Sequence, residues 1–248
     1  MRIITAAVIK GGTGKTTTCA TLAQAAAADR KKVLAIDLDP QANLSAFLAA
    51  DQNQPGSYQL LHGTPAAELI QQTRQGLDVI AASPDLATER TGPASAKRLQ
   101  TAIEPIRAKY DLIVIDTPPQ MGELTFNALQ AATGLIIPLE TDNSSLQGLY
   151  QICDIAAQLQ HSNPDLSIIG AILTRYDSRP NLNRYLRAAI EERGKELGAP
   201  LIGTIRPGIA IREAQALAEN LYSYAPRSKP AQDYQELYKR IVAKKKTK

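Results

Sequence analysis

The residues with the clearest chemical meaning form one glycine-rich run near the start of the chain. The run reads Lys10-Gly11-Gly12-Thr13-Gly14-Lys15-Thr16-Thr17, follows an apolar β-branched segment and opens an alanine-rich stretch. Glycines let backbone N–H groups approach a phosphate closely, and the N-terminus of a following helix adds partial positive charge. The run therefore predicts a phosphate-binding loop between a strand and a helix.

Three side chains of this loop have expected roles. Lys15 is placed to reach the β- and γ-phosphates of a nucleotide, and the Thr16 hydroxyl is placed to bind Mg²⁺. Thr17 is expected to face the α-phosphate. The general pattern G-x-x-x-x-G-K-[ST] has a glycine where this chain has Ile9, and an extra lysine, Lys10, stands at the loop entrance. The strict pattern therefore fails, and the alternative interpretation is a glycine turn followed by a chance lysine.

The loop resembles that of the deviant Walker A ATPases of the ParA/MinD group, whose pattern K-G-G-x-G-K-[ST] it matches at every fixed position. The resemblance implies that Lys10 crosses a dimer interface to contact the phosphates of the partner's ATP, in the manner of an arginine finger supplied in trans. It also implies that ATP and Mg²⁺ are bound by Gly11, Gly12, Thr13, Gly14, Lys15, Thr16 and Thr17.

Two acidic motifs at expected strand ends extend the resemblance. Asp37-Leu38-Asp39-Pro40-Gln41 resembles the family's D-x-D-P-Q motif, which implies that Asp39 orients the attacking water and that Asp37 lies in the second shell of Mg²⁺. The run from Ile113 to Pro119 resembles the Walker B strand, with Asp116 holding Mg²⁺ through a water. A carboxylate at the C-terminal end of a parallel strand points into the ligand crevice of an α/β sheet. Taken alone, each motif fits a turn or a helix cap equally well.

Two later stretches resemble the parts of the family that line its adenine pocket. Residues 174–179 (TRYDSR) resemble T-x-[FY]-D-x-R, and residues 205–214 (IRPGIAIREA) resemble I-P-R-N-x-x-x-x-E-A. The resemblance assigns Arg175, Arg206 and Pro207 to the base site. The Pro–Arg order of the family is inverted here, and Arg206 is expected to stack on adenine as a planar cation while Pro207 packs against it.

Short apolar runs alternate with helical patterns along the whole chain, which predicts βαβ units and a parallel sheet. The expected strands are Ile3–Ile9, Val33–Asp37, Leu77–Ala81, Leu112–Asp116, Leu135–Leu139, Ile168–Thr174 and Leu201–Ile205. The expected helices are Lys15–Ala28, Ser95–Lys109, Glu123–Ala131, Ser144–Gln160, Asn181–Leu197, Ile209–Glu219 and Ala231–Lys244. The fold class is α/β, a P-loop NTPase with a mostly parallel twisted sheet and helices on both faces. We expect one domain over residues 1–248, with an irregular insertion from Asp51 to Gly76.

Charge is distributed unevenly along the chain. Residues 1–174 hold 12 Lys and Arg against 16 Asp and Glu, whereas residues 175–248 hold 16 against 8. A basic C-terminal third suggests a polyanionic partner, either nucleic acid or an anionic membrane, and the alternative is a solvated surface. ParA-type ATPases bind DNA without sequence preference through basic residues in two such regions. The resemblance therefore assigns double-stranded DNA to Arg179, Arg184, Arg187, Arg227 and Lys229, with Leu182 and Leu186 on the apolar side of their helix.

The last expected helix carries Tyr234, Leu237, Tyr238, Ile241 and Val242 on one face. A basic amphipathic helix can lie on a membrane, but this face is short, and we expect it to pack on the protein's own sheet. No run of 18 apolar residues and no signal peptide is found, and Cys19 and Cys153 are interpreted as core residues. These features predict a cytoplasmic protein with no membrane partner.

The resemblance implies a partition ATPase in a short form, without an N-terminal helix-turn-helix. Binding of ATP·Mg²⁺ is expected to close a homodimer that binds nonspecific DNA on the nucleoid. A ParB-like, centromere-bound partner is expected to stimulate a slow intrinsic ATPase and release monomers. The alternative is a MinD-like spatial regulator that acts on a membrane.

Overall fold

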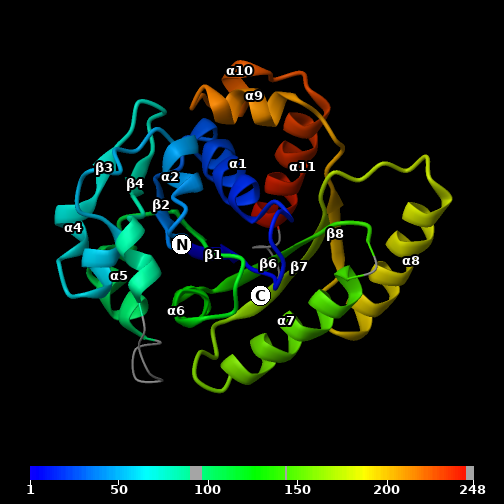
Figure 1. The fold of residues 1–248 in the computed structure, drawn as a ribbon, viewed down its shortest axis with the longest axis horizontal. Helices are drawn as coiled ribbons and strands as arrows, with labels where there is room; N and C mark the ends of the chain where they lie inside the picture. Colours follow the sequence, from blue (N-terminus) through cyan, green and yellow to red (C-terminus); the bar gives the residue numbers. More distant parts are fainter. Residues whose placement is uncertain (90–96, 143, 244–248) are drawn as a thin grey trace.

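The computed structural model describes residues 1–89, 97–142 and 144–243, and its centre is an eight-stranded sheet (Figure 1). The strands lie in the order β3-β4-β2-β5-β1-β6-β7-β8, and every neighbouring pair is parallel except β3 and β4. Their bounds are β1 Arg2–Ala6, β2 Val33–Asp37, β3 Gln71–Gln72, β4 Asp78–Ile80, β5 Leu112–Asp116, β6 Gly134–Leu139, β7 Ser167–Leu173 and β8 Leu201–Thr204.

The central strands are apolar at nearly every position because helices cover both faces of the sheet. All five residues of β2 and all five of β5 are buried. Their register pairs Asp37 with Asp116, and Asp116 is also paired with Ala6 of β1. The C-terminal ends of the three strands therefore lie level at one edge of the sheet, where the loop after β1 also begins.

Two helical layers enclose the sheet, as Figure 1 shows. One core packs α1 Lys15–Ala28, α2 Asn43–Phe47, α9 Ala210–Ala216, α10 Leu221–Tyr224 and α11 Lys229–Ala243 against the sheet. The other face carries α5 Arg98–Arg107, α6 Glu123–Ala131, α7 Ser145–Leu159 and α8 Asn181–Glu196. The predicted fold class, a mostly parallel α/β sheet with helices on both faces, is confirmed.

The prediction of an irregular insertion over Asp51–Gly76 is wrong. This segment forms α3 Ser57–Leu61, α4 Ala66–Leu69 and strand β3, which pairs antiparallel with β4 and extends the sheet. Helices this short carry too little periodicity to be recognised, although Leu60 and Leu69 are buried. Also unpredicted are α2, α10 and the 3₁₀ helix η1 Pro84–Thr88. The predicted start of one helix at Ser95 lies outside the described residues.

Helix α11 packs its apolar face against the protein itself, as predicted. Tyr234, Leu237, Tyr238 and Ile241 are buried, whereas Val242 is 39% exposed. The Tyr234 hydroxyl lies 3.2 Å from Thr18 Oγ1 on α1, and the Tyr238 hydroxyl donates to Asp29 at 3.0 Å. Lys244 to Lys248 lie outside the described residues. Within residues 1–89, 97–142 and 144–243, no helix is both long enough and apolar enough to span a membrane.

Candidate nucleotide site

The glycine-rich run forms a tight loop between β1 and α1. Gly12 and Gly14 have φ values of 75° and 90°, which side chains other than glycine rarely adopt. A Cβ on Gly14 would also lie 3.3 Å from Thr174 Cγ2. The Thr174 hydroxyl donates to the Thr13 carbonyl at 2.8 Å, so the end of β7 clamps the loop. The backbone therefore holds the shape that a phosphate-binding loop requires.

Lys15 lies inside this loop and is 6% exposed. Its Nζ donates a 2.9 Å hydrogen bond to the Lys10 carbonyl oxygen. Burial lowers the pKa of Lys15, and the nearby carboxylates of Asp116 and Asp39 oppose that shift. The ammonium group is thus held at the centre of the loop, close to acidic groups.

Asp37, at the end of β2, is fully buried and accepts three hydrogen bonds. Its Oδ1 accepts from the Asp39 N–H at 3.0 Å, and its Oδ2 accepts from the Ser45 N–H at 2.8 Å and the Ser45 hydroxyl at 2.7 Å. Burial raises the pKa of Asp37 to about 6, and the Ser45 hydrogen bonds oppose the rise. Asp37 therefore fixes the turn that carries Asp39 and the start of α2, and a position behind a metal ion fits it better than direct ligation.

Asp116, at the end of β5, differs from Asp37 in its hydrogen bonding. Both of its oxygens are buried, and neither accepts a hydrogen bond of normal distance and angle among the described residues, although the Thr16 hydroxyl lies near enough to favour the charged form. Burial and the charge of Asp37 raise the pKa of Asp116 well above its usual range, while the Thr16 hydroxyl and the Lys15 ammonium oppose the rise. A buried carboxylate without a partner is costly, so this group is built for a cation that a ligand brings.

The residues present fit Mg²⁺ held together with a polyphosphate. Within the described part of the chain, no group of three or more His, Cys, Asp or Glu could hold a metal ion without help. Mg²⁺ is usually bound by one or two carboxylates together with waters and substrate phosphates. Asp116 and the Thr16 hydroxyl supply the oxygens that such a site needs.

Asp39 lies at the mouth of the loop and is 6% exposed. Its Oδ1 accepts a 3.0 Å hydrogen bond from the Gln41 N–H, and its own N–H is held by Asp37. Asp39 lines the same cavity as the phosphate loop. A carboxylate there can orient a water beside a bound phosphate.

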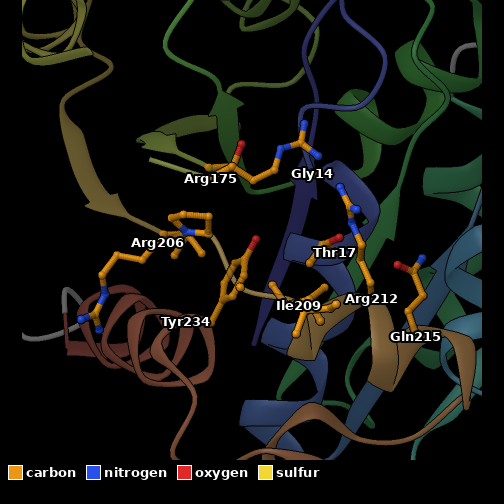
Figure 2. A pocket seen from close by; sticks show the side chains of 13 residues that line it. Gly14, Thr17, Arg175, Arg206, Ile209, Arg212, Gln215 and Tyr234 are labelled. Atoms are coloured by element: carbon orange, nitrogen blue, oxygen red, sulfur yellow. The ribbon is translucent and has the colours of Figure 1, made fainter. Parts of the chain in front are cut away.

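Two adjoining cavities open along the loop. The first, of about 370 Å³, is lined by Gly11, Gly12, Gly14, Lys15, Thr16, Thr17, Asp39, Gln41, Asn43, Pro119, Arg175 and Gln215. The second, of about 470 Å³ and shown in Figure 2, is lined by Gly14, Thr17, Thr174, Arg175, Ile205, Arg206, Pro207, Gly208, Ile209, Ile211, Arg212, Gln215 and Tyr234. The first is lined by the loop and suits phosphates, and the second is larger and more apolar than polar, which suits a nucleoside.

The two arginines expected at the base site, Arg175 and Arg206, point in different directions. Arg175, with φ 51°, reaches back over the loop, where its Nη2 donates to the Gly12 carbonyl at 2.5 Å and its Nε to Glu140 at 2.6 Å. Arg206 extends away from the cavity (Figure 2) and binds Asp233 of α11 through Nε and Nη2. In this arrangement the Arg206 guanidinium is directed away from the cavity, and Pro207 forms part of the cavity wall.

Lys10, the lysine expected to act in trans, is held at the rim by its own chain. Its ammonium pairs with Asp142 and donates to the Ser144 hydroxyl at 3.1 Å. Partial burial acts to raise the pKa of Asp142, but the Lys10 ammonium and the Ser144 hydroxyl outweigh it and lower the pKa. Lys10 is absent from the described linings of both cavities.

The five basic residues assigned to DNA lie on two exposed segments. Arg179 pairs with Asp177 at 2.6 Å and lowers the pKa of that carboxyl to about 2. On α8, Arg184 and Arg187 are exposed, and the Arg187 guanidinium lies 5.5 Å from the centre of the Tyr176 ring. Arg227 and Lys229 are exposed at the start of α11.

One expectation for α8 is wrong. Leu182 was expected on the packed side, but it is 59% exposed, and its neighbour Tyr185 is 72% exposed. The first turn of α8 is exposed, and the packing of this helix against the core starts at Leu186 and Ile190.

Sequence reasoning missed several residues that build the site. The Ser45 hydroxyl donates a hydrogen bond to Asp37, and it also accepts one from the Ala82 N–H at 2.9 Å. Arg212 and Tyr234 line the nucleoside cavity from α9 and α11. Arg212 lies in the stretch 205–214 that resembles the family's adenine pocket, but no role of its own was predicted for it. No local motif marks Ser45 or Tyr234, because each depends on a contact between distant parts of the chain. Cys19 and Cys153 are buried, as predicted.

Comparison with known proteins agrees with this geometry. A family model described as an AAA domain matches residues 1–168. The Bacillus subtilis sporulation initiation inhibitor protein Soj is 36% identical over 94% of this chain and 95% of its own length. The Myxococcus xanthus chromosome partitioning protein ParA is 35% identical over 98% of this chain and 90% of its own length.

This chain belongs to the ParA/Soj family of partition ATPases. A solved relative, the septum site-determining protein MinD of Pyrococcus horikoshii complexed with Mg-ADP, is 26% identical and has a TM-score of 0.80. The alignment covers 100% of this chain and 99% of that one. The predicted membership of this chain in the ParA/MinD group is thereby confirmed.

Proposed function

We propose that this ParA/Soj-family chain is an ATP-dependent DNA-partition ATPase, with residues 1–248 forming one ATPase domain in the cytoplasm. ATP·Mg²⁺ closes a sandwich dimer that binds nonspecific DNA on the nucleoid, and hydrolysis stimulated by a ParB-like partner releases monomers. The observation that carries the proposal is the placement of the two loop lysines. Lys15 lies inside its own phosphate cavity, whereas Lys10 stands at the rim, where a partner's nucleotide could reach it.

The chain's own groups bind the nucleotide in the proposed complex. Lys15 leaves the Lys10 carbonyl to contact the β- and γ-phosphates, and the loop N–H groups bind the phosphate oxygens. Thr16 and Asp116 hold Mg²⁺, with Asp37 behind them, and the ion neutralises charge on the phosphates when it is bound. Arg175 and Pro207 border the base.

Asp39 is proposed to orient the water that attacks the γ-phosphate. Asp37 fixes the turn that carries it, so the carboxylate is positioned before the nucleotide arrives. Slow intrinsic turnover follows, because one catalytic cation, Lys10, must come from a second chain and must first leave Asp142. A partner that stabilises the dimer would raise the rate.

The proposed DNA surface is the exposed basic part of the C-terminal third. Arg184 and Arg187 on α8, together with Arg227 and Lys229, are exposed, and phosphate contacts suffice for binding without sequence preference. A MinD-like membrane switch is less well supported, because four of the five apolar side chains on the α11 face are buried inside the protein.

Sedimentation with DNA or with anionic liposomes tests the proposal. With ATP and Mg²⁺, we expect the protein to sediment with random duplex DNA, and to remain in solution with liposomes or with ADP. Sedimentation with liposomes alone would instead support the membrane switch. Sedimentation with neither, in a protein that binds ATP, would contradict a partition role.

A further inference from the structure

The nucleoside cavity is lined by three arginines, and two of them are already paired with carboxylates. Arg175 pairs with Glu140, and Arg206 pairs with Asp233. The third, Arg212 of α9, lines the same cavity and is exposed. Throughout the described ranges, its guanidinium has no ion pair and no side-chain hydrogen bond. Its full charge therefore remains available to a ligand in the cavity.

Arg212 stands where the two cavities meet. Figure 2 shows its side chain extending from α9 toward Gly14 of the loop and Thr17 of α1, which line both cavities. Gln215 follows three residues later on the same helix face and also lines both cavities. The guanidinium thus faces the junction between the phosphate and nucleoside parts of the site.

The acidic neighbour of Arg212 is directed elsewhere. Glu213 accepts a 3.3 Å hydrogen bond from the Tyr224 hydroxyl, which lies on α10. Consecutive residues of a helix point in different directions, so Glu213 does not neutralise the guanidinium. A cation left unpaired at the wall of a cavity is the expected complement of an anionic ligand.

Helix α9 is held by hydrogen bonds from the turn between β3 and β4, at one edge of the sheet. Arg74 Nη2 donates to the carbonyls of Leu217 and Ala218 at 2.9 and 3.1 Å, and Gln75 Nε2 donates to Ala218 at 2.9 Å. Gln75 also donates to the Phe47 carbonyl of α2 at 2.6 Å. A cation at a helix C-terminus stabilises the helix, so the backbone that carries Arg212 is held in place before a ligand binds.

From this geometry we propose that Arg212 binds the α-phosphate of the nucleotide held by its own chain. The inference rests on the proposed function and deepens it by adding a cation for the phosphate nearest the nucleoside. Lys15 and the loop N–H groups line the other cavity, where they would bind the outer phosphates. Because ADP and ATP share the α-phosphate, Arg212 contributes equally to the affinity for both.

Calorimetric titration of ADP·Mg²⁺ and of a nonhydrolysable ATP analogue tests the assignment. Arg212→Ala should weaken both nucleotides by about tenfold and by the same factor, as expected for loss of one charge-assisted hydrogen bond. Arg212→Lys should recover part of the loss, since it keeps the charge without the planar fork. Arg107→Ala is the matched control, because this α5 arginine pairs with Glu104 on the surface and lines neither cavity as described, so its loss should leave both affinities unchanged.

Three results would overturn the inference. Affinities of Arg212→Ala within twofold of wild type would make Arg212 a solvated surface residue. A loss for the ATP analogue alone would place its contact at the γ-phosphate or across the dimer. Failure of the wild-type protein to bind either nucleotide would remove the proposed function itself, and that outcome is visible before any variant is measured. Unchanged thermal unfolding of Arg212→Ala without nucleotide shows that the fold is intact.

Discussion

Lys15 Nζ donates a 2.9 Å hydrogen bond to the carbonyl oxygen of Lys10, so one lysine of the loop rests on the backbone of the other. The Lys10 side chain points away from this contact and pairs with Asp142 at the start of α7. The two ammonium groups therefore have different partners, a backbone carbonyl for Lys15 and a carboxylate for Lys10. Lys15 is committed to the site of its own chain, and Lys10 is free to serve another only after it leaves Asp142.

Replacement of Lys10 should separate nucleotide binding from dimerisation. Lys10→Ala should bind ATP with near wild-type affinity, because Lys10 lines neither cavity in the described structure, but it should fail to dimerise with ATP. Light scattering with a nonhydrolysable analogue measures this. A normal ATP-dependent dimer in the variant would remove Lys10 from the assigned role.

Replacement of Asp142 should have the opposite effect on ATP-dependent dimerisation. Asp142→Asn keeps an oxygen for the Ser144 N–H but removes the charge that holds Lys10. We expect faster ATP-dependent dimerisation, seen as a higher rate in stopped-flow light scattering. A slower rate would mean that Asp142 assists the dimer instead of restraining Lys10.

Replacement of Asp39 should trap the ATP dimer. Dimerisation uses phosphate contacts, whereas hydrolysis needs the carboxylate, and loss of a positioned base typically lowers a rate by about 10²–10⁴. Phosphate release by Asp39→Ala, measured with DNA and partner present, should fall accordingly while the dimer persists. Turnover equal to wild type would contradict the assignment.

Replacement of Asp116 should stabilise the nucleotide-free protein. Because the pKa of Asp116 is raised in the folded state, the fold loses stability as the pH rises from the ordinary aspartate pKa to the raised one, and the full cost of the buried charge is present above it. Asp116→Asn removes the buried charge, and we expect a gain of about 1–3 kcal/mol in the free energy of unfolding. Urea unfolding should show a larger gain at high pH than at low pH. Magnesium-dependent nucleotide binding should be lost, and equal stability at every pH would show that the group is solvated.

Charge reversal on the basic surface should weaken binding to all DNA sequences alike. Arg184→Glu, Arg187→Glu and Arg227→Glu should each lower affinity for random duplex while ATP binding is kept. Each phosphate contact contributes about −0.9 to the slope of log K against log salt, and a dimer loses two contacts per substitution, so the slope should flatten by about 2. Arg107→Glu on α5 is the control. Unchanged affinity and slope in all three variants would mean a solvated surface.

Much of the fold could be predicted because strong local signals agree with it. The predicted bounds of β2, β5, α1 and α6 match the structure, since apolar β-branched runs, the alanine-rich helix and the glycine loop each favour one conformation. The ends of β2 and β5 then bring Asp37 and Asp116 together. Both carboxylates could be placed from the sequence, because each ends an apolar strand and the C-terminal ends of parallel strands meet at one side of the sheet.

The rest depends on contacts between distant residues. Arg206 turns away from the cavity because Asp233 accepts its guanidinium, and Lys10 is held by a carboxylate 132 residues away. Helix α9 is fixed by Arg74 from the turn between β3 and β4. No periodicity or motif records such pairs, so the direction of these side chains could not be predicted.

The mass of Asp39→Ala in solution tests the central claim most directly. Light scattering after gel filtration should give the mass of one chain without nucleotide or with ADP, and of two chains with ATP and Mg²⁺. Adding Lys10→Ala to the same chain should return the ATP sample to the mass of one chain. A single mass under all three nucleotide conditions, or a dimer that persists without Lys10, would contradict a dimer switched by ATP through this lysine.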